Sequence, residues 1–345
     1  MSATSTATAA LHLAVYFLDR GFEPATKARA FSRAADVVAG LDDRELRDRA
    51  EAGTLTELDG IGPSTASVIA DAVLGRTPEY LTKLDERTRL DAGAGSGLLE
   101  RCRSDLHSHS TWSDGGASVR TMAATARALG RTHLALTDHS PRLTVAHGLT
   151  PERLADQLEE VAALNAELAP FRILTGCEVD ILADGSLDLP DDVLAGLDVV
   201  VASAHSKLSM PERQMTERLV RAVASPHVDI LGHCTGRMLT GRGRPPSSFD
   251  AELVFAACAQ FGTAVELNCR PERQDPPDDL LDLALEWNCF LSVDSDAHSP
   301  GQLEWVTHGY ERLGERGIDP DRILTTWDAD ALLDWCAPVE ADPVG

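Results

Sequence analysis

The residues best suited to chemistry in this sequence are histidines and carboxylates that gather in six short clusters. These clusters lie at residues 105–114, 137–140, 176–180, 203–206, 231–234 and 294–298. Each cluster belongs to the end of a short apolar run of the kind that forms a buried strand. Neutral imidazoles and carboxylates are the usual ligands of Zn²⁺, Mn²⁺ or Fe²⁺ at neutral pH. The pattern therefore predicts a metal centre.

Spacing within the clusters supports this prediction. Residues i and i+2 of an extended segment point to the same side, so His107 and His109 can hold one ion together, as can Asp296 and His298. A single carboxylate such as Glu178 can bridge two ions. A lone histidine near a strand end is more often an ordinary polar residue than a ligand. Six strand ends in succession indicate a shared site of two or three divalent ions.

Such a site suits the hydrolysis of phosphate esters. Two or three ions can lower the pKa of a bridging water, hold the phosphoryl oxygens and stabilise the leaving oxygen. Phosphate recognition also favours cations, and Arg237, Arg273 and Lys207 each follow a predicted strand end. They are candidates for substrate binding, with a solvated surface charge as the alternative. The aspartates that either orient ligand imidazoles or are ordinary loop residues are Asp138, Asp180 and Asp294.

The elements that must position these residues alternate along the chain. Strands are expected at about 104–108, 133–138, 171–179, 198–204, 228–233, 263–268 and 290–295. Helical patterns follow at 151–168, 211–224, 250–261 and 277–287. Alternation of this kind predicts parallel strands with crossover helices, and seven units can close into a βα barrel whose catalytic groups sit where strands end. The expected fold class is α/β, a distorted seven-stranded βα barrel.

The amino-terminal part reads differently. Residues 8–88 show apolar residues at helical spacing, and the first ten residues are expected to form a frayed tail rather than a signal peptide. A glycine-rich stretch marks a linker at 89–103, and the expected catalytic domain spans 104–336.

The chain has no apolar run of eighteen residues, so we expect no membrane span. Its odd cysteine count and lack of a CxxC pair favour a reducing cytoplasm.

The formal charge of −24 disfavours tight, non-specific binding of nucleic acid by the whole surface. A local site stays open, because bound divalent cations are often the largest local charges in such a site. The ordinary explanation of an acidic surface is solubility.

The clusters resemble the motifs of the PHP family, the polymerase and histidinol phosphatase domain, over about residues 103–336. The resemblance implies a distorted seven-stranded βα barrel, an active metal-dependent hydrolase, and Glu178, Asp296 and His298 as candidate catalytic residues. It implies His107, His109, Glu178 and Asp296 as ligands of one ion, Glu178, His205 and His233 of a second, and Asp114, His139 and His298 of a third.

The resemblance is closer to the PHP domain that ends bacterial family X DNA polymerases. Residues 214–218, 233–237 and 266–268 read like that subgroup, although Cys234 stands where proline is usual. The sequence also resembles the small helical domain that opens those polymerases, at residues 20–38 and 53–75.

That small domain carries a helix-hairpin-helix, and here Gly60, Ile61 and Gly62 would form the hairpin that meets DNA. A glycine-lined turn lets backbone N–H groups approach a phosphate at a helix amino terminus. Pro63 and Ser64 stand where relatives often carry a lysine. The alternative is a helical module used for packing or protein contact.

Three hypotheses of function follow. The first is a metal-dependent phosphoesterase acting on DNA 3′ ends in repair, as a 3′-phosphatase or 3′–5′ exonuclease, with DNA ends held by the amino-terminal domain. No polymerase palm separates the two parts, so we expect no DNA synthesis. The second is a small-molecule phosphomonoesterase such as a histidinol-phosphatase. The third is a DNA- or protein-binding module with structural metals.

Overall fold

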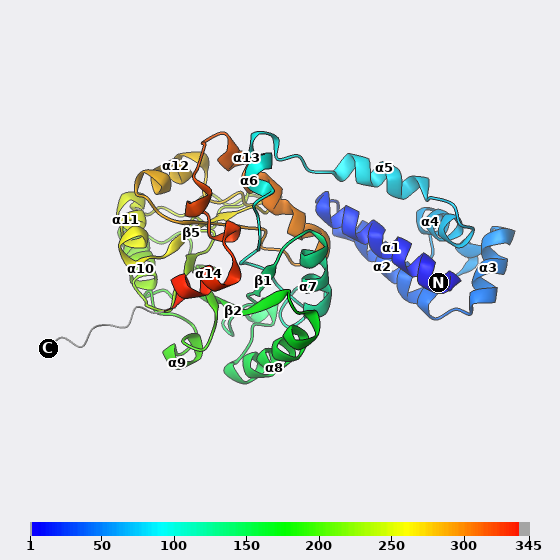
Figure 1. The fold of residues 1–345 in the computed structure, drawn as a ribbon, viewed down its shortest axis with the longest axis horizontal. Helices are drawn as coiled ribbons and strands as arrows, with labels where there is room; N and C mark the ends of the chain where they lie inside the picture. Colours follow the sequence, from blue (N-terminus) through cyan, green and yellow to red (C-terminus); the bar gives the residue numbers. More distant parts are fainter. Residues whose placement is uncertain (1, 338–345) are drawn as a thin grey trace. The chain divides into compact units, whose positions relative to one another are not determined.

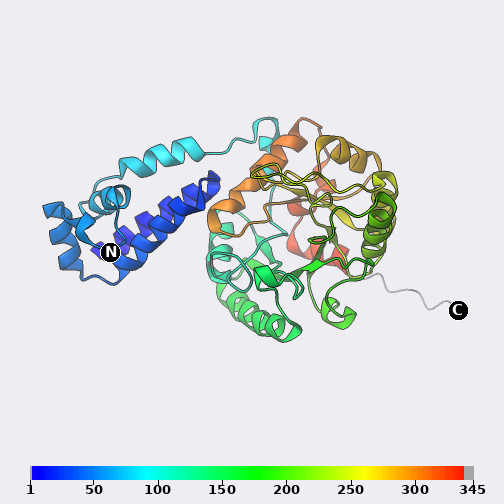
Figure 2. The same cartoon turned by 180° about the vertical axis from the view of Figure 1, so that it is seen from behind.

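The computed structural model describes residues 2–337 and divides the chain into two compact units, Met1–Leu90 and Asp91–Gly345. Figures 1 and 2 show the two units from opposite sides. Among the described residues, no helix is both long enough and apolar enough to span a membrane.

The first unit is entirely helical. Its elements are α1 (Ala3–Arg20), α2 (Ala25–Ala39), α3 (Asp43–Ala52), the short 3-10 helix η1 (Leu55–Glu57), α4 (Pro63–Val73) and α5 (Glu79–Thr88). The expectation of a frayed tail over the first ten residues was wrong. Ser2 caps α1 by accepting from the Ser5 N–H, and Ala3 and Ala7 are buried. Small residues gave this segment too weak an apolar pattern to be recognised as helix.

An apolar core holds these helices together. Leu11 and Leu18 of α1 pack in one cluster with Phe31 of α2 and Ile69 of α4. These side chains recur at helical spacing, so each helix turns one apolar face inward. The first unit therefore folds around a core of apolar side chains contributed by its helices.

The predicted hairpin lies between η1 and α4. Gly60 has φ of +87°, a left-handed conformation that favours glycine. Gly62 is the N-cap of α4, and its N–H donates to Thr65 Oγ1 at 2.9 Å. Ile61 is buried in the apolar core and anchors the turn.

The second unit contains a parallel sheet with the strand order β1-β2-β3-β4-β5-β6. Its strands are β1 (His133–Leu136), β2 (Arg172–Asp180), β3 (Val199–Ser203), β4 (Ile230–Leu231), β5 (Ala264–Asn268) and β6 (Leu291–Asp294). Its α-helices are α6 (Ser96–Leu99), α7 (Val119–Ala128), α8 (Pro151–Leu168), α9 (Asp191–Leu194), α10 (Glu212–Val223), α11 (Ala251–Phe261), α12 (Asp278–Glu286), α13 (Val306–Gly314) and α14 (Ala329–Cys336). Its 3-10 helices are η2 (Gly93–Gly95), η3 (Thr144–Ala146), η4 (Pro300–Trp305), η5 (Pro320–Arg322) and η6 (Leu324–Thr326).

Local sequence explains these elements. Strand β3 consists of three valines, an alanine and a serine, all buried, as expected of a strand covered on both faces. Helix α8 begins at Pro151 after Thr150, whose side chain accepts from the Arg153 N–H. The long crossovers place helices around the outside of the strands (Figure 1). The carboxyl ends of neighbouring strands meet at one edge of the sheet because the register aligns them, pairing Asn268 with Asp294.

The expectation of a seventh strand at 104–108 needs correction, because the described residues form six strands. This segment lies between the edge strands β1 and β6 and bonds to both sides. Its Ser108 carbonyl accepts from the Thr137 N–H at 2.8 Å, and an isolated bridge joins Ser108 to Ala297. Buried side chains replace the missing ladder bonds: Asp294 Oδ1 accepts from the Leu106 N–H at 2.7 Å. The result is a six-stranded parallel sheet whose two edges are tied together by an irregular segment.

The glycine-rich stretch after residue 91 packs within the second unit. It forms η2 and α6, and both elements contact α13. A Cβ on Gly95 would lie 1.8 Å from the Tyr310 carbonyl oxygen, so only glycine allows this approach.

Candidate metal centre

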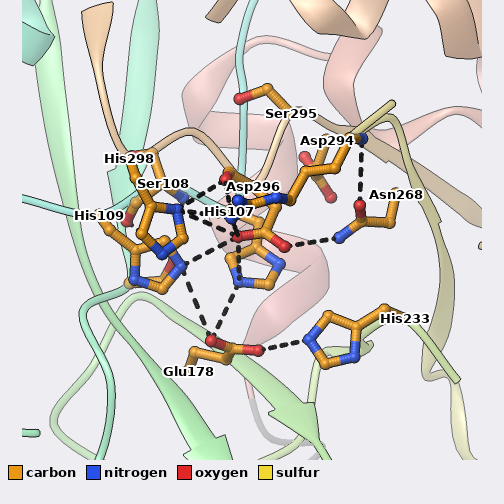
Figure 3. Close-up of polar contacts among 12 residues, drawn as sticks. His107, Ser108, His109, Glu178, His233, Asn268, Asp294, Ser295, Asp296 and His298 are labelled. Atoms are coloured by element: carbon orange, nitrogen blue, oxygen red, sulfur yellow. Dashed lines mark hydrogen bonds and ion pairs between the residues drawn. The ribbon is translucent and has the colours of Figure 1, made fainter. Parts of the chain in front are cut away.

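The carboxyl ends of the strands bring the predicted ligand side chains into one largely buried cluster. Figure 3 shows its members His107, His109, Glu178, His233, Asp296 and His298. Glu178 lies at its centre, on β2, with 1% of its surface exposed. Five imidazoles surround its carboxylate, with nitrogen-to-oxygen distances of 3.4 Å for His107, 3.7 Å for His109, 2.8 Å for His139, 3.2 Å for His205 and 2.9 Å for His233. A carboxylate with this many imidazoles around it is placed to bridge ions.

Two further carboxylates complete the cluster. Asp296 Oδ1 lies 3.4 Å from His109 Nε2 and 3.5 Å from His298 Nδ1. Asp114 Oδ1 lies 3.2 Å from His298 Nε2 and 3.5 Å from His139 Nε2. The Asp114 side chain is 35% exposed and that of His298 is 19% exposed, whereas Glu178 is covered. The cluster is therefore open to solvent on the Asp114 side.

Three groups of side chains place their ligand atoms within 4.8 Å of one another. They are His109, Asp114, His139 and His298; His107, His109 and Glu178; and His139, Glu178 and His205. The first group contains the set predicted for the third ion, with His109 added. The second contains most of the set predicted for the first ion. The third pairs Glu178 and His205 with His139, while His233 contacts Glu178 from another side.

Unsatisfied nitrogens test whether these residues suit metal ions. His107 Nε2, His109 Nε2 and His233 Nδ1 are buried and have no hydrogen-bond partner. Buried polar atoms without partners cost free energy. Imidazole nitrogens that gather around carboxylates form a donor set for a divalent cation. The residues present therefore fit divalent metals.

The pKa values of two neighbouring imidazoles in the cluster are shifted in opposite directions. Burial opposes charge on His107, but the carboxylates of Glu266, Glu178 and Asp296 outweigh it and raise its pKa well above the usual value. Burial, aided by His298 and His139, holds the pKa of His109 well below its usual value.

Neighbouring charges also decide the state of the carboxylates. Burial would raise the pKa of Glu178, but the imidazoles of His205, His107 and His139 overcome it and lower that pKa. Glu178 thus stays ionised, as a metal ligand must be.

Backbone conformation at two of these residues is unusual. Asp296 has φ of +52° and His233 has φ of +20°, in the left-handed region that non-glycine residues rarely adopt. Such conformations carry a cost of about 1–3 kcal/mol and tend to cluster at functional sites.

Two residues on β5 support the cluster, although neither was among the predicted site residues. Glu266 Oε1 lies 2.6 Å from His107 Nδ1, and its Oε2 accepts from the His233 N–H at 2.5 Å. Asn268 donates to Asp296 Oδ2 at 3.0 Å. Both side chains are fully buried, and both lie on the same side of the strand. The signal that could have identified them is a glutamate and an asparagine two residues apart in an otherwise apolar strand.

The aspartates with two candidate roles take up different positions. Asp180 contacts His205 Nδ1 at 3.2 Å and so orients that imidazole. Asp138 instead accepts from Ser110 and Gln157, which fixes the loop after the first cluster. Asp294 supports the irregular segment through Leu106.

The candidate substrate-binding cations differ in whether they line the cavity over the cluster. Arg273 lines a cavity of about 250 Å³ over the cluster, together with Arg270, which donates to Asp296 Oδ1 at 3.3 Å. Arg237 is turned away, because its guanidinium donates to the carbonyls of Arg273 and Gln274. Lys207 is exposed and does not line the cavity.

A family model and several known proteins are similar to this chain. The family model described as the PHP domain matches residues 105–268. The chain is 46% identical over 238 residues to the DNA polymerase/3′-5′ exonuclease PolX of Bacillus subtilis, covering 68% of this chain and 41% of that protein. A "Probable phosphatase" of Vibrio parahaemolyticus is 30% identical over 237 residues, covering 64% of this chain and 88% of the relative.

A solved structure of histidinol phosphate phosphatase from Lactococcus lactis, complexed with zinc, L-histidinol and phosphate, matches with a TM-score of 0.46 and 17% identity. That match covers 63% of this chain and 95% of the other.

The chain belongs to the PHP domain family. Family membership and the buried ligand cluster together make it a metal-dependent phosphoesterase. It spans about two fifths of the Bacillus subtilis PolX, to which it is similar.

Proposed function

We propose that this protein hydrolyses phosphate esters at nucleic-acid 3′ ends, as a 3′-phosphatase or a 3′–5′ exonuclease. The observation that carries the proposal is the set of imidazoles and carboxylates around Glu178, in a chain similar to a polymerase/3′-5′ exonuclease. The helical unit with its glycine turn before α4 supports nucleic acid as the substrate.

We propose that the site holds two or three ions of zinc, manganese or iron. The residues that would hold them are His107, His109, Asp114, His139, Glu178, His205, His233, Asp296 and His298. When bound, such ions supply a water of lowered pKa and stabilise charge on the phosphoryl and leaving oxygens.

The chain's own residues have separate tasks in this proposal. Asp114 and His298 lie on the exposed side of the cluster, so the substrate phosphate enters there. Arg270 and Arg273 line the cavity and hold the phosphate by charge-assisted hydrogen bonds. Glu266 holds His107 and His233 in place from behind.

The test is incubation with 3′-phosphate and 3′-hydroxyl oligonucleotides plus Mn²⁺. The proposal predicts release of phosphate from the first or of mononucleotides from the second. The double variant His107→Ala with His109→Ala should reduce turnover to background without unfolding the protein. His227→Ala is the matched control, since His227 lies before β4, away from the cluster. Rapid turnover of small phosphomonoesters, with neither oligonucleotide hydrolysed, would contradict the proposal.

One observation favours a small phosphomonoester as the second candidate substrate. The cavity of about 250 Å³ over the cluster suits a phosphate and a small leaving group. A screen of phosphorylated metabolites would distinguish the two, because a dedicated small-molecule phosphatase turns over one metabolite far faster than any oligonucleotide end.

A further inference from the structure

Most basic side chains of the second unit are engaged within the protein. Arg312 and Arg316 both pair with Asp278, and Arg120 pairs with Glu167. Among the described residues of this unit, the basic side chains that form neither an ion pair nor a hydrogen bond are Arg101, Arg103, Arg127, Arg142, Lys207 and Arg242. The chain has 55 acidic and 31 basic residues, so carboxylates outnumber the cations that can pair with them.

These unpaired cations divide between the two ends of the sheet. Arg142, Lys207 and Arg242 lie on loops that follow β1, β3 and β4, at the end where the ligand cluster lies. Arg101, Arg103 and Arg127 lie before β1, at the opposite end. The first three are exposed, and each lies on a loop that also contributes a residue to the cavity lining: Leu143 beside Arg142, His205 before Lys207 and Met238 before Arg242.

The loop that carries Arg242 is a hairpin built out from the cavity wall. Met238 lines the cavity, and its N–H and carbonyl pair with Arg244 at 2.9 Å in both directions. Leu239 is tied by its N–H to the Glu272 carbonyl at 2.7 Å. The backbone thus fixes the hairpin, while the Arg242 guanidinium at its tip stays free.

The other two positions are fixed in the same manner. Arg142 precedes Leu143, which lines the cavity, and its N–H donates to Asp188 Oδ2 at 2.6 Å. Lys207 lies two residues after His205, and its carbonyl accepts from the Met210 N–H at 3.1 Å. The Arg218 guanidinium donates to the preceding Ser206 carbonyl at 2.8 Å. Each loop holds its backbone in place and presents an unpaired cation.

We propose that Arg142, Lys207 and Arg242 form a ring that binds the phosphates flanking the scissile one in a single-stranded nucleic acid. The inference rests on the proposed function and names its substrate as a strand of several phosphates. A small phosphomonoester has no further phosphates for the ring to bind. Phosphates of a strand neutralise such cations with release of counterions, which makes the affinity depend on salt.

The experiment compares two triple variants of the full chain. Arg142→Ala, Lys207→Ala and Arg242→Ala remove the ring. Arg101→Ala, Arg103→Ala and Arg127→Ala remove three equally unpaired and exposed charges at the other end of the sheet. The two variants have the same net charge. Each is assayed with Mn²⁺ on a ten-nucleotide single strand and on a dinucleotide, whose single phosphodiester has no flanking phosphates.

The parent and the control should prefer the ten-nucleotide strand, and the ring variant should lose this preference through a rise in KM on the order of tenfold or more. The slope of log(kcat/KM) against log salt should flatten by about 2, from three contacts at about 0.7 each. Equal preference in ring variant and control would overturn the inference. Failure of the parent to release phosphate from a 3′-phosphate oligonucleotide or nucleotides from a 3′-hydroxyl one, with small phosphomonoesters turned over, would instead overturn the proposed function on which the ring depends.

Discussion

The two units of this protein differ in the polar side chains that they bury beside their apolar cores. In the described part of the first unit the buried polar side chains are Arg20, Thr65 and Thr88. The Arg20 charge is balanced by Asp85 at 2.7 Å. The second unit buries Glu178 and Glu266 with at most 1% exposure, together with a group of imidazoles.

Both units bury apolar side chains, whereas the second also buries a group of carboxylates and imidazoles at its strand ends. An apolar side chain contributes about 1.5–3 kcal/mol when buried. A buried charge costs free energy unless it is paired or coordinates a metal. The second unit therefore gives up stability at the strand ends, and we expect bound cations to restore it.

Removing metal should separate the units most strongly. With metal at a thousand times its Kd, binding stabilises the folded unit by about 4 kcal/mol, so a chelator should lower the unfolding temperature of the second unit alone. All five tryptophans lie in that unit, so their fluorescence reports on it. Far-UV circular dichroism reports on both units. A tryptophan transition that stays in place on chelation would contradict the comparison.

Asp229 gives a pH effect confined to the second unit. It precedes β4 and accepts from the Val200 N–H at 2.8 Å, and burial raises its pKa to about 7. A raised pKa means that the folded state holds the proton more tightly than the unfolded chain, whose pKa is near 3.9. The stability due to this proton is complete below pH 3.9 and is lost as the pH rises through 7. Asp229→Asn should remove up to about 4 kcal/mol of that dependence.

The measurement is urea unfolding followed by tryptophan fluorescence at pH 5 and pH 8. The difference between variant and parent should grow towards pH 8. The same difference at both pH values would show that Asp229 ionises normally.

Glu266→Gln should weaken metal binding by about 10- to 100-fold, because a partner that orients a ligand imidazole contributes on that scale. Competition with a chromophoric chelator measures the metal affinity directly. Glu266→Asp should recover part of the loss, and Glu286→Gln on the exposed face of α12 is the matched control. An unchanged metal affinity in Glu266→Gln would show that Glu266 does not support the metal ligands.

Gly60→Ala should produce the smallest change, in the first unit only. Its φ of +87° disfavours a side chain by roughly 1–2 kcal/mol. A Cβ there would also lie 3.2 Å from Arg33 Cδ. Circular dichroism should show an earlier transition for the helical unit, and tryptophan fluorescence should be unchanged. A shift of the tryptophan transition would show that the two units unfold as one.

Much of the second unit's architecture follows from local sequence. Short runs of strand-forming residues predicted strands near 198–204 and 263–268, and the structure has β3 and β5 there. The sequence could not distinguish 104–108 from a strand, because the bonds that replace its ladder join it to remote residues. The Leu106 N–H donates to Asp294, and Asp105 accepts from the Ser295 N–H. Apolar periodicity reports burial, but not which partner a backbone N–H finds.

The site shows the same limit. Spacing at strand ends indicated which side chains could meet, and the structure brings His107, His139 and Glu178 within contact. The spacing could not indicate that the Arg237 guanidinium points towards backbone carbonyls while Arg270 lines the cavity. These orientations depend on loop backbones fixed by contacts such as Thr235 with Asp275.

Metal content is the most direct measurement of the central claim. Purified protein is equilibrated with Mn²⁺ or Zn²⁺, passed through a desalting column and subjected to elemental analysis. The proposed centre predicts two or three ions per chain in the parent and in His227→Ala, and a clear loss in His107→Ala with His109→Ala. A parent that retains no ions, or a double variant that retains as many as the parent, would contradict it.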